Sequence, residues 1–177
     1  AKRRVFDGQD AAQTAVIGVD DDHCRRIHDD LKTQGGRSVL PISSEIAVKG
    51  GVYARDGMLI DDLEGAARPA LDLRDVATLP GRHNWQNAAA AYATARAVGV
   101  APAAIAEGIR SYPGLAHRQE LVGTIRGIRF VNDSKATNAD AAAKALASYA
   151  TIYWIAGGKP KDGPLDALNP FFKNVRR

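Results

Sequence analysis

The chain has 177 residues, of which 45% are apolar and 25% are charged, so its composition predicts a folded protein of one domain or parts of two. The single cysteine excludes an internal disulfide framework, and we see neither a signal-peptide pattern nor an apolar run near the roughly 20 residues that a bilayer crossing needs. We therefore expect a cytoplasmic protein without membrane contact. The net charge of +4 and the isoelectric point near 9.3 are consistent with phosphate-bearing partners.

The first predicted element is a short β-branched strand from Thr14 to Val19, which ends in three aspartates, Asp20 to Asp22. Three adjacent carboxylates could face a metal or a nucleotide. Adjacent residues do not share a face, however, so an acidic first turn of a helix is the stronger interpretation. That helix is expected over residues 23–32 and ends at Gly35-Gly36.

A different pattern follows in residues 37–75. Val39 to Ile42 predicts a short strand with an edge proline. Two apolar runs, 52–54 and 58–60, flank Arg55-Asp56-Gly57, and Asp-Gly between such runs is a strong hairpin signal. We expect an antiparallel meander attached to an α/β body, whose charged residues form a solvated surface without chemistry.

Two helices are predicted next. Asn84 is the expected N-cap of the first, and Gly99 ends it. Pro102 begins the second, which stops before Pro113. Asn84 and Asn87 are three residues apart, so they share a face at the helix start, where their carboxamides could bind the edge of an adenine ring or simply cap the helix.

Pro113-Gly114 breaks the chain, and we expect a domain boundary here that separates residues 1–112 from residues 113–177. His117-Arg118 follows directly. A guanidinium offers a bidentate fork to phosphate oxygens, and beside a hinge it could reach a nucleotide held by the other domain. A surface pair without a ligand is the alternative.

A hairpin is predicted from residues 120–125 and 128–131 across Arg126-Gly127. The polar loop Asn132–Asn138 then separates this hairpin from an alanine-rich helix over residues 139–149. In open α/β sheets, ligands bind at the carboxyl ends of strands, which is where this loop lies. The same residue types are ordinary turn formers, so a loop without function is the alternative.

The start of this last helix has two candidate caps. Thr137 and Asp140 have the spacing of a capping box, and Asn138 is an alternative N-cap. Thr151 to Ala156 then predicts a parallel strand, which would complete a right-handed β-loop-α-β unit of Rossmann type. Gly157-Gly158 and the lysines after it would lie at the same sheet edge and could wrap an anion.

The loop sequence Asn132-Asp-Ser-Lys-Ala-Thr-Asn138 resembles the signature of the UDP-N-acetylmuramoyl-L-alanine:D-glutamate ligases, ATP-dependent enzymes that build the peptidoglycan stem peptide. Three further stretches agree in order and spacing, so the resemblance covers about residues 80 to 168. These stretches are Gly81-Arg-His-Asn-Trp-Gln-Asn87, Gly114-Leu-Ala-His-Arg118 and Gly157-Gly-Lys-Pro-Lys161.

The resemblance implies an α/β chain: part of a central P-loop-type ATPase domain, followed by the start of a Rossmann-like C-terminal domain. It implies a ligase in peptidoglycan synthesis, hence in cell shape and division. ATP and Mg²⁺ would activate the carboxyl of UDP-N-acetylmuramoyl-L-alanine as an acyl phosphate, and the amine of D-glutamate would attack it. The family also implies a monomer at full length, without nucleic-acid partners.

Carried over position by position, the resemblance implies nucleotide contacts for five residues. Asn84 and Asn87 would contact adenine, and Asp133 would hold the ribose hydroxyls. Arg118, with His117 beside it, would approach the phosphates.

The resemblance also implies catalytic and substrate-binding residues. Lys135 and Thr137 would lie near the acceptor carboxyl and the incoming D-glutamate. Lys161 would bind a D-glutamate carboxylate, with Lys159 as a further candidate.

The departures from the family predict an incomplete machinery. The sequence contains no Gly-x-x-x-x-Gly-Lys-Ser/Thr motif, so the phosphate-binding loop is absent, and the magnesium ligands are expected outside this chain. We therefore expect the back half of the central domain joined to the front half of the C-terminal domain, without ligase activity as it stands.

Three alternatives remain open from the sequence. The chain could come from a related stem-peptide ligase or a folylpolyglutamate synthase, although the loop around Asp133 argues against both. It could be a non-catalytic Rossmann-type nucleotide-binding module. The helix-turn-helix order of residues 84–112 and the basic isoelectric point also allow a nucleic-acid binder that uses Arg96 and Arg110.

Overall fold

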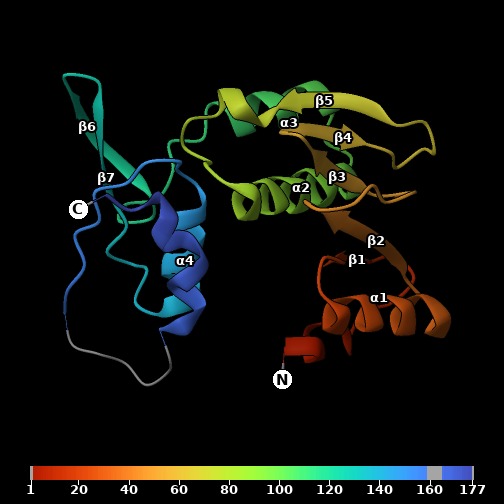
Figure 1. Ribbon diagram of the computed structural model, residues 1–177. Helices are drawn as coiled ribbons and strands as arrows, with labels where there is room; N and C mark the ends of the chain where they lie inside the picture. The colour runs from red at the N-terminus through yellow and green to blue at the C-terminus, as the bar shows by residue number, and fades with distance from the viewer. Residues whose placement is uncertain (1, 159–164, 177) are drawn as a thin grey trace. The chain divides into compact units, whose positions relative to one another are not determined.

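The computed structural model describes residues 2–158 and 165–176, and it divides the chain into two compact units (Figure 1). The first unit comprises residues 1–76 and 82–111, and the second comprises residues 77–81 and 112–177.

A five-stranded sheet in the order β1-β2-β3-β4-β5 is the centre of the first unit. β1, β2 and β3 are parallel, whereas β3, β4 and β5 form antiparallel pairs. The sheet therefore combines the parallel part and the meander that the sequence predicts. The strands are β1 (Thr14–Gly18), β2 (Ser38–Ser43), β3 (Val52–Arg55), β4 (Met58–Asp61) and β5 (Arg68–Asp72).

The β3–β4 hairpin has the predicted two-residue turn. Asp56 and Gly57 both have positive φ, 51° and 84°, as a type I′ turn requires. The expectation of an edge proline is wrong, because β2 lies between β1 and β3. Its pairing with β3 involves only Ile42 and Ser43, so Pro41 lies outside that part of the ladder.

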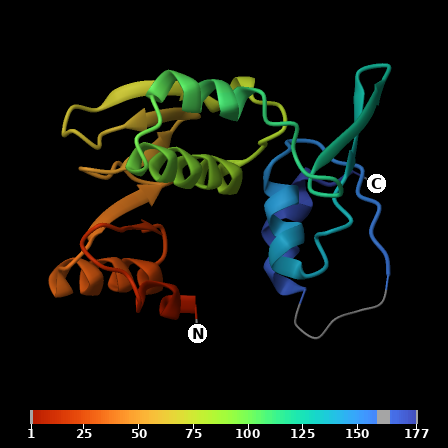
Figure 2. The same cartoon turned by 180° about the vertical axis from the view of Figure 1, so that it is seen from behind.

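Helices cover both faces of the sheet (Figures 1 and 2). Ala15 and Ile17 of β1 pack against Leu31 of α1, whereas Gly18, on the opposite face, lies against Gln86 of α2. α2 packs on β1, β2 and β3, and α3 packs on α2 and β5. The helices are α1 (Asp22–Gln34), α2 (Arg82–Ala97) and α3 (Pro102–Arg110), with short 3₁₀ turns at Lys2–Phe6 and Leu73–Asp75.

The helix ends confirm most of the capping predictions. The Asp21 carboxylate accepts the Cys24 N–H at 2.9 Å, a contact that lowers the pKa of Asp21, so the aspartate run does begin a helix. Gly99 follows α2 with φ of 86°, and Pro102 begins α3. Asn84 as N-cap is wrong: α2 begins at Arg82, directly after a positive-φ glycine, so Asn84 lies in the first turn.

Charged residues of the meander are not all solvated, contrary to expectation. The Asp61 carboxylate accepts hydrogen bonds from the Tyr92 hydroxyl at 3.0 Å and from Arg96 Nε at 3.1 Å. Asp62 is buried and accepts the Gly50 N–H at 3.0 Å. No local periodicity indicates these contacts, because their partners lie 12 to 35 residues away in the chain.

The strands of the second unit form the predicted hairpin, which turns at Arg126-Gly127 with φ of 50° and 79°. α4 follows the polar loop, and its N-cap is Asn138, whose side chain accepts the Ala141 N–H at 2.8 Å. The structure therefore confirms Asn138 as the N-cap, rather than the capping box of Thr137 and Asp140. The elements are β6 (Glu120–Ile125), β7 (Ile128–Asn132), α4 (Ala139–Ala147) and a 3₁₀ helix, η3 (Asp166–Asn174).

The predicted strand from Thr151 to Ala156 is wrong, and so is the β-loop-α-β crossover that depends on it. Only Ile152 makes a β-bridge, to Val175, and Ile155 is 99% exposed. A parallel strand needs a neighbour along its whole length, and the described residues supply one at a single position. α4 instead packs on η3, where Leu146 and Leu168 are buried.

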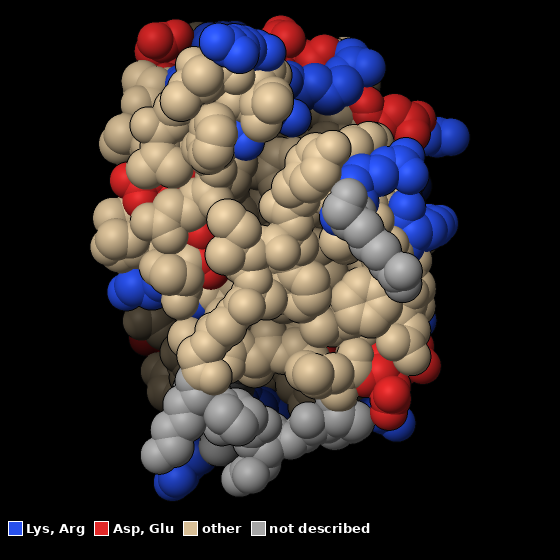
Figure 3. All heavy atoms as spheres, turned by 60° about the vertical axis from the view of Figure 1, so that its left-hand side comes forward, with Lys and Arg blue, Asp and Glu red and all other residues tan. Residues whose placement is uncertain are grey.

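Apolar side chains remain exposed in the second unit, among them Val122, Ile128 and Phe130 of the hairpin. Figure 3 shows a face whose centre is largely uncharged, with acidic and basic residues toward its margins. None of the helices in the described residues has both the length and the apolar character that a membrane crossing requires.

Candidate functional site

The first cluster of predicted site residues lies at the start of α2. Asn84 and Asn87 share one face there, as predicted, and the Asn87 amide donates to the Asn84 side-chain oxygen at 3.4 Å. Asn87 is exposed and Asn84 is partly buried. A carboxamide can both donate and accept hydrogen bonds, which is the chemistry that a purine edge needs.

Asp20 fixes this end of α2 to the sheet. Its carboxylate accepts a hydrogen bond from Gln86 Nε2 at 2.6 Å, from the Ser44 N–H at 2.8 Å and from the Ser44 hydroxyl at 3.1 Å, and it also accepts from the Ser43 hydroxyl. Gln86 is the residue directly before Asn87, so the network positions the turn that carries the asparagines. Sequence reasoning missed Gln86 and the pair Ser43 and Ser44. The available signal was an acidic residue, Asp20, after one buried strand, together with the serines at the end of the neighbouring strand.

The second cluster joins two loops of the second unit. The Lys135 N–H donates to the His117 carbonyl at 3.1 Å, and the Gln119 N–H donates to Asp133 Oδ1 at 3.1 Å. The loop at residues 132–138 is thereby held against the turn at residues 114–119. The structure brings together the predicted residues His117, Arg118, Asp133 and Lys135, and Thr137 belongs to the same loop, where its N–H donates to the Lys135 carbonyl.

The turn that carries Arg118 has an uncommon backbone. His117 and Gln119 have φ of 64° and 45°, a left-handed conformation that costs non-glycine residues about 1–2 kcal/mol. Glu120 offsets this strain by accepting the His117 N–H at 2.8 Å. Such backbone outliers cluster at functional sites, and here sequence reasoning had no signal for the conformation or for Glu120.

Asn132 orients the His117 ring. Its side-chain oxygen accepts the Ser134 N–H at 3.1 Å, so its amide nitrogen faces His117 Nδ1 at 2.8 Å. The amide donates, hence Nδ1 accepts and the neutral imidazole carries its proton on Nε2. His117 therefore presents an N–H donor beside Arg118.

The electrostatics of this cluster suit an anionic ligand with hydroxyl groups. Burial raises the pKa of Asp133, while the Gln119 N–H and the nearby Arg118 charge oppose that rise. Within residues 2–158 and 165–176, neither the Arg118 guanidinium nor the Lys135 ammonium has an ion-pair partner. The Arg118 charge thus lies near a partly buried carboxylate, and Lys135 belongs to the same loop as that carboxylate.

Some predicted residues remain outside this description. Lys159 and Lys161 lie outside the described residues.

The asparagine pair belongs to the first unit, whereas the cluster around Asp133 belongs to the second. The described part of the chain contains no group of three or more His, Cys, Asp or Glu side chains that could hold a metal ion.

Comparison with known proteins shows similarity over the whole chain. It is 51% identical over 177 residues to the UDP-N-acetylmuramoylalanine–D-glutamate ligase of Rhodospirillum rubrum and 49% identical to that of Phenylobacterium zucineum. The matches cover 100% of this chain but only 37% and 38% of those relatives. No family model matches the chain.

Solved structures show the same fold. The UDP-N-acetylmuramoylalanyl-D-glutamyl-2,6-diaminopimelate–D-alanyl-D-alanyl ligase of Acinetobacter baumannii matches with a TM-score of 0.56 and 23% identity, covering 82% of this chain and 32% of that one. At this identity the likeness concerns the α/β fold alone.

Proposed function

Because this chain belongs to the UDP-N-acetylmuramoylalanine–D-glutamate ligase family, we propose that it forms the part of such a ligase that binds the base and ribose of ATP and approaches D-glutamate. The observation that supports this most is identity near 50% over the whole chain to relatives with that name. In this proposal residues 1–112 are the later part of the central ATP-binding domain, and residues 113–177 begin the Rossmann-like ligase domain.

Five residues make the nucleotide contacts in this proposal. Asn84 and Asn87 bind adenine through their carboxamides. Asp133 accepts hydrogen bonds from the ribose hydroxyls, and Arg118 and His117 donate to phosphate oxygens. Support comes from the shared face of the asparagines and from the Arg118 guanidinium, which has no ion-pair partner in the described structure.

The substrate side uses Lys135, Thr137 and Lys161. Lys135 and Thr137 lie near the acceptor carboxyl and the incoming amine, where a positive charge and a hydroxyl stabilise the negative charge that develops during carboxyl activation. Lys161 binds a D-glutamate carboxylate. ATP supplies the phosphoryl group that activates the acceptor, and the Mg²⁺ ligands belong to parts of the ligase outside this chain.

The cellular setting follows from the family. The substrates are UDP-N-acetylmuramoyl-L-alanine and D-glutamate, the pathway is peptidoglycan synthesis, and the location is the cytoplasm. The full-length enzyme acts as a monomer without nucleic-acid partners.

The comparisons favour the ligase over the two other function classes. The structure also weakens the nucleic-acid alternative, because Arg96, one of its two candidate cations, is engaged in a partly buried network. Arg96 donates to Asp61 and to Glu64.

Nucleotide binding by the chain itself tests the proposal. We expect ATP to raise the melting temperature of the wild-type chain and to leave that of Asp133→Ala unchanged. Asp30→Ala, which removes an exposed carboxylate on α1, is the matched control and should respond like the wild type. A wild-type chain that millimolar ATP does not stabilise would count against the proposal.

Catalysis by the chain alone is the second measurement. With ATP, Mg²⁺, UDP-N-acetylmuramoyl-L-alanine and D-glutamate present, we expect no phosphate release above the blank, because the sequence lacks the phosphate-binding loop. Release that depends on D-glutamate would contradict this expectation.

A further inference from the structure

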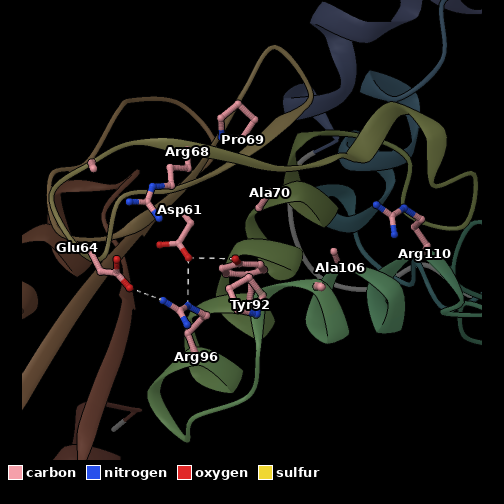
Figure 4. A pocket seen from close by; sticks show the side chains of 12 residues that line it. Asp61, Glu64, Arg68, Pro69, Ala70, Tyr92, Arg96, Ala106 and Arg110 are labelled. Atoms are coloured by element: carbon pink, nitrogen blue, oxygen red, sulfur yellow. Dashed lines mark hydrogen bonds and ion pairs between the residues drawn. The ribbon is translucent and has the colours of Figure 1, made fainter.

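A groove in the first unit is lined by residues that belong to neither of the two clusters described above. It is open between the β4–β5 strands on one side and α2 and α3 on the other, with a volume of about 590 Å³ (Figure 4). Small-molecule sites commonly have volumes of about 300–1,000 Å³, so the groove can hold a compact organic molecule.

The polar wall of the groove is already ordered. The Tyr92 hydroxyl and Arg96 Nε both donate to Asp61 Oδ2, at 3.0 and 3.1 Å, and Arg96 Nη2 donates to Glu64 at 3.0 Å (Figure 4). The Arg96 and Asp61 side chains are only 21% and 13% exposed. Burial, together with the bond to Asp61, raises the pKa of Tyr92 to about 12, so its hydroxyl keeps its proton and continues to donate.

Small and rigid residues leave the groove open. Pro69 and Ala70 line it from β5, and Ala103 and Ala106 line it from α3. These side chains present apolar surface but are too short to fill the space between the sheet and the helices. The groove is therefore hollow because of residue size, and the apolar part of its lining suits a small hydrocarbon body.

Cations exceed anions along the lining. Arg68, Arg96 and Arg110 face only two carboxylates, those of Asp61 and Glu64, which leaves an excess of one positive charge. Arg68 has no ion-pair partner within the described residues. Arg110 pairs with Glu107, but both side chains are more than half exposed, so that pair is weak.

We propose that this groove is a second binding site, which takes a small amphipathic monoanion: a flat apolar body with one carboxylate. The body lies on the alanine and proline surface. The carboxylate accepts hydrogen bonds from the Arg68 guanidinium, whose planar fork can donate two of them in parallel. The site is independent of the ligase assignment, because it shares no residue with either cluster.

An NMR titration of the ¹⁵N-labelled chain tests the site, with 1-naphthoate as the probe and the neutral isostere 1-naphthamide as its control. We expect naphthoate to shift amide signals in β5 and α3 and to bind about tenfold more tightly than naphthamide. Arg68→Gln should remove that preference for the acid. Arg55→Gln, an exposed cation of β3 outside the groove, should preserve it.

Variants that fill the groove provide a second test of the site. Ala103→Phe places a ring in the hollow from an exposed position of α3, and Ala66→Phe does so from a loop if the helix variant does not fold. Either variant should abolish the shifts from both probes. Equal affinity for acid and amide, an unchanged preference in Arg68→Gln, or shifts that persist in a folded, filled variant would overturn the proposal.

Discussion

Asp20 accepts a hydrogen bond of 2.6 Å from Gln86, and this contact ties the carboxyl end of β1 to the helix turn that bears the asparagine pair. The same carboxylate binds Ser43 and Ser44 at the end of β2. One side chain thus joins two parallel strands and a helix at the sheet edge where α/β proteins bind ligands. The position of Asn87 is therefore set by the sheet as well as by the helix.

Loss of the Asp20 carboxylate should destabilise the first unit. Asp20→Ala leaves the Ser44 N–H and the Gln86 amide without their acceptor, so we expect a cost of roughly 2–3 kcal/mol in the free energy of unfolding, measured in urea. Asp30→Ala, at an exposed ion pair, should cost less than about 1 kcal/mol. Equal costs for the two variants would contradict the network.

Asp133→Asn should raise the stability of the protein and weaken its binding of ATP. The pKa of Asp133 is raised in the folded protein, so the folded state binds its proton more tightly and the charged form opposes folding as the pH rises through this pKa. The asparagine keeps an acceptor for the Gln119 N–H but cannot ionise. We expect the variant to be more stable than the wild type at pH 7, with a difference that disappears below about pH 4.

The same variant should bind ATP more weakly, because it lacks the charged acceptor that we propose for the ribose hydroxyls. Calorimetric titration at pH 7 would measure this affinity. A variant that is less stable at pH 7 yet binds normally would reverse both expectations.

Asn138 should stabilise α4 as its N-cap. Asn138→Ala removes the bond to the Ala141 N–H and should cost about 1 kcal/mol of stability. Asn138→Asp keeps a side-chain acceptor at the N-cap, so it should cost less in thermal unfolding. If Asn138→Asp proves as destabilising as Asn138→Ala, the capping assignment is wrong.

Because of Tyr92, the stability of the protein should fall as the pH becomes alkaline. The unfolded chain releases this proton near pH 10 and the folded chain near pH 12, so unfolding becomes easier between these values. Tyr92→Phe lacks this proton, and its stability should fall less steeply over the same interval in urea titrations. Parallel curves for the two proteins would exclude a buried, protonated tyrosine.

Local patterns predicted local structure well. The Asp56-Gly57 and Arg126-Gly127 turns, the strands around them and the helix that begins at Pro102 all depend on neighbouring residues, and all appear in the structure. The placement of Asp133, Lys135 and His117 in one cluster could be anticipated only from the family resemblance.

The predictions that failed were those that depend on long-range contacts. Thr151 to Ala156 has the composition of a buried strand, but a strand also needs partners, and sequence composition does not show whether they are present. The meander pattern predicts a solvated surface for its charged residues, Asp61 among them, because the partners of Asp61, Tyr92 and Arg96, lie 31 and 35 residues further along the chain. Burial of a charged residue depends on such distant contacts, which no local period reveals.

A chimeric ligase tests the central claim most directly. This chain would replace the matched segment of the Rhodospirillum rubrum relative, to which it is 51% identical over 177 residues, and phosphate release that depends on D-glutamate would be measured. We expect the chimera to retain activity and Lys135→Ala within it to lose that activity by about 100-fold or more, because Lys135 is the cation that we propose near the reacting carboxyl. A folded chimera without activity, or a Lys135→Ala chimera as active as its parent, would contradict the account.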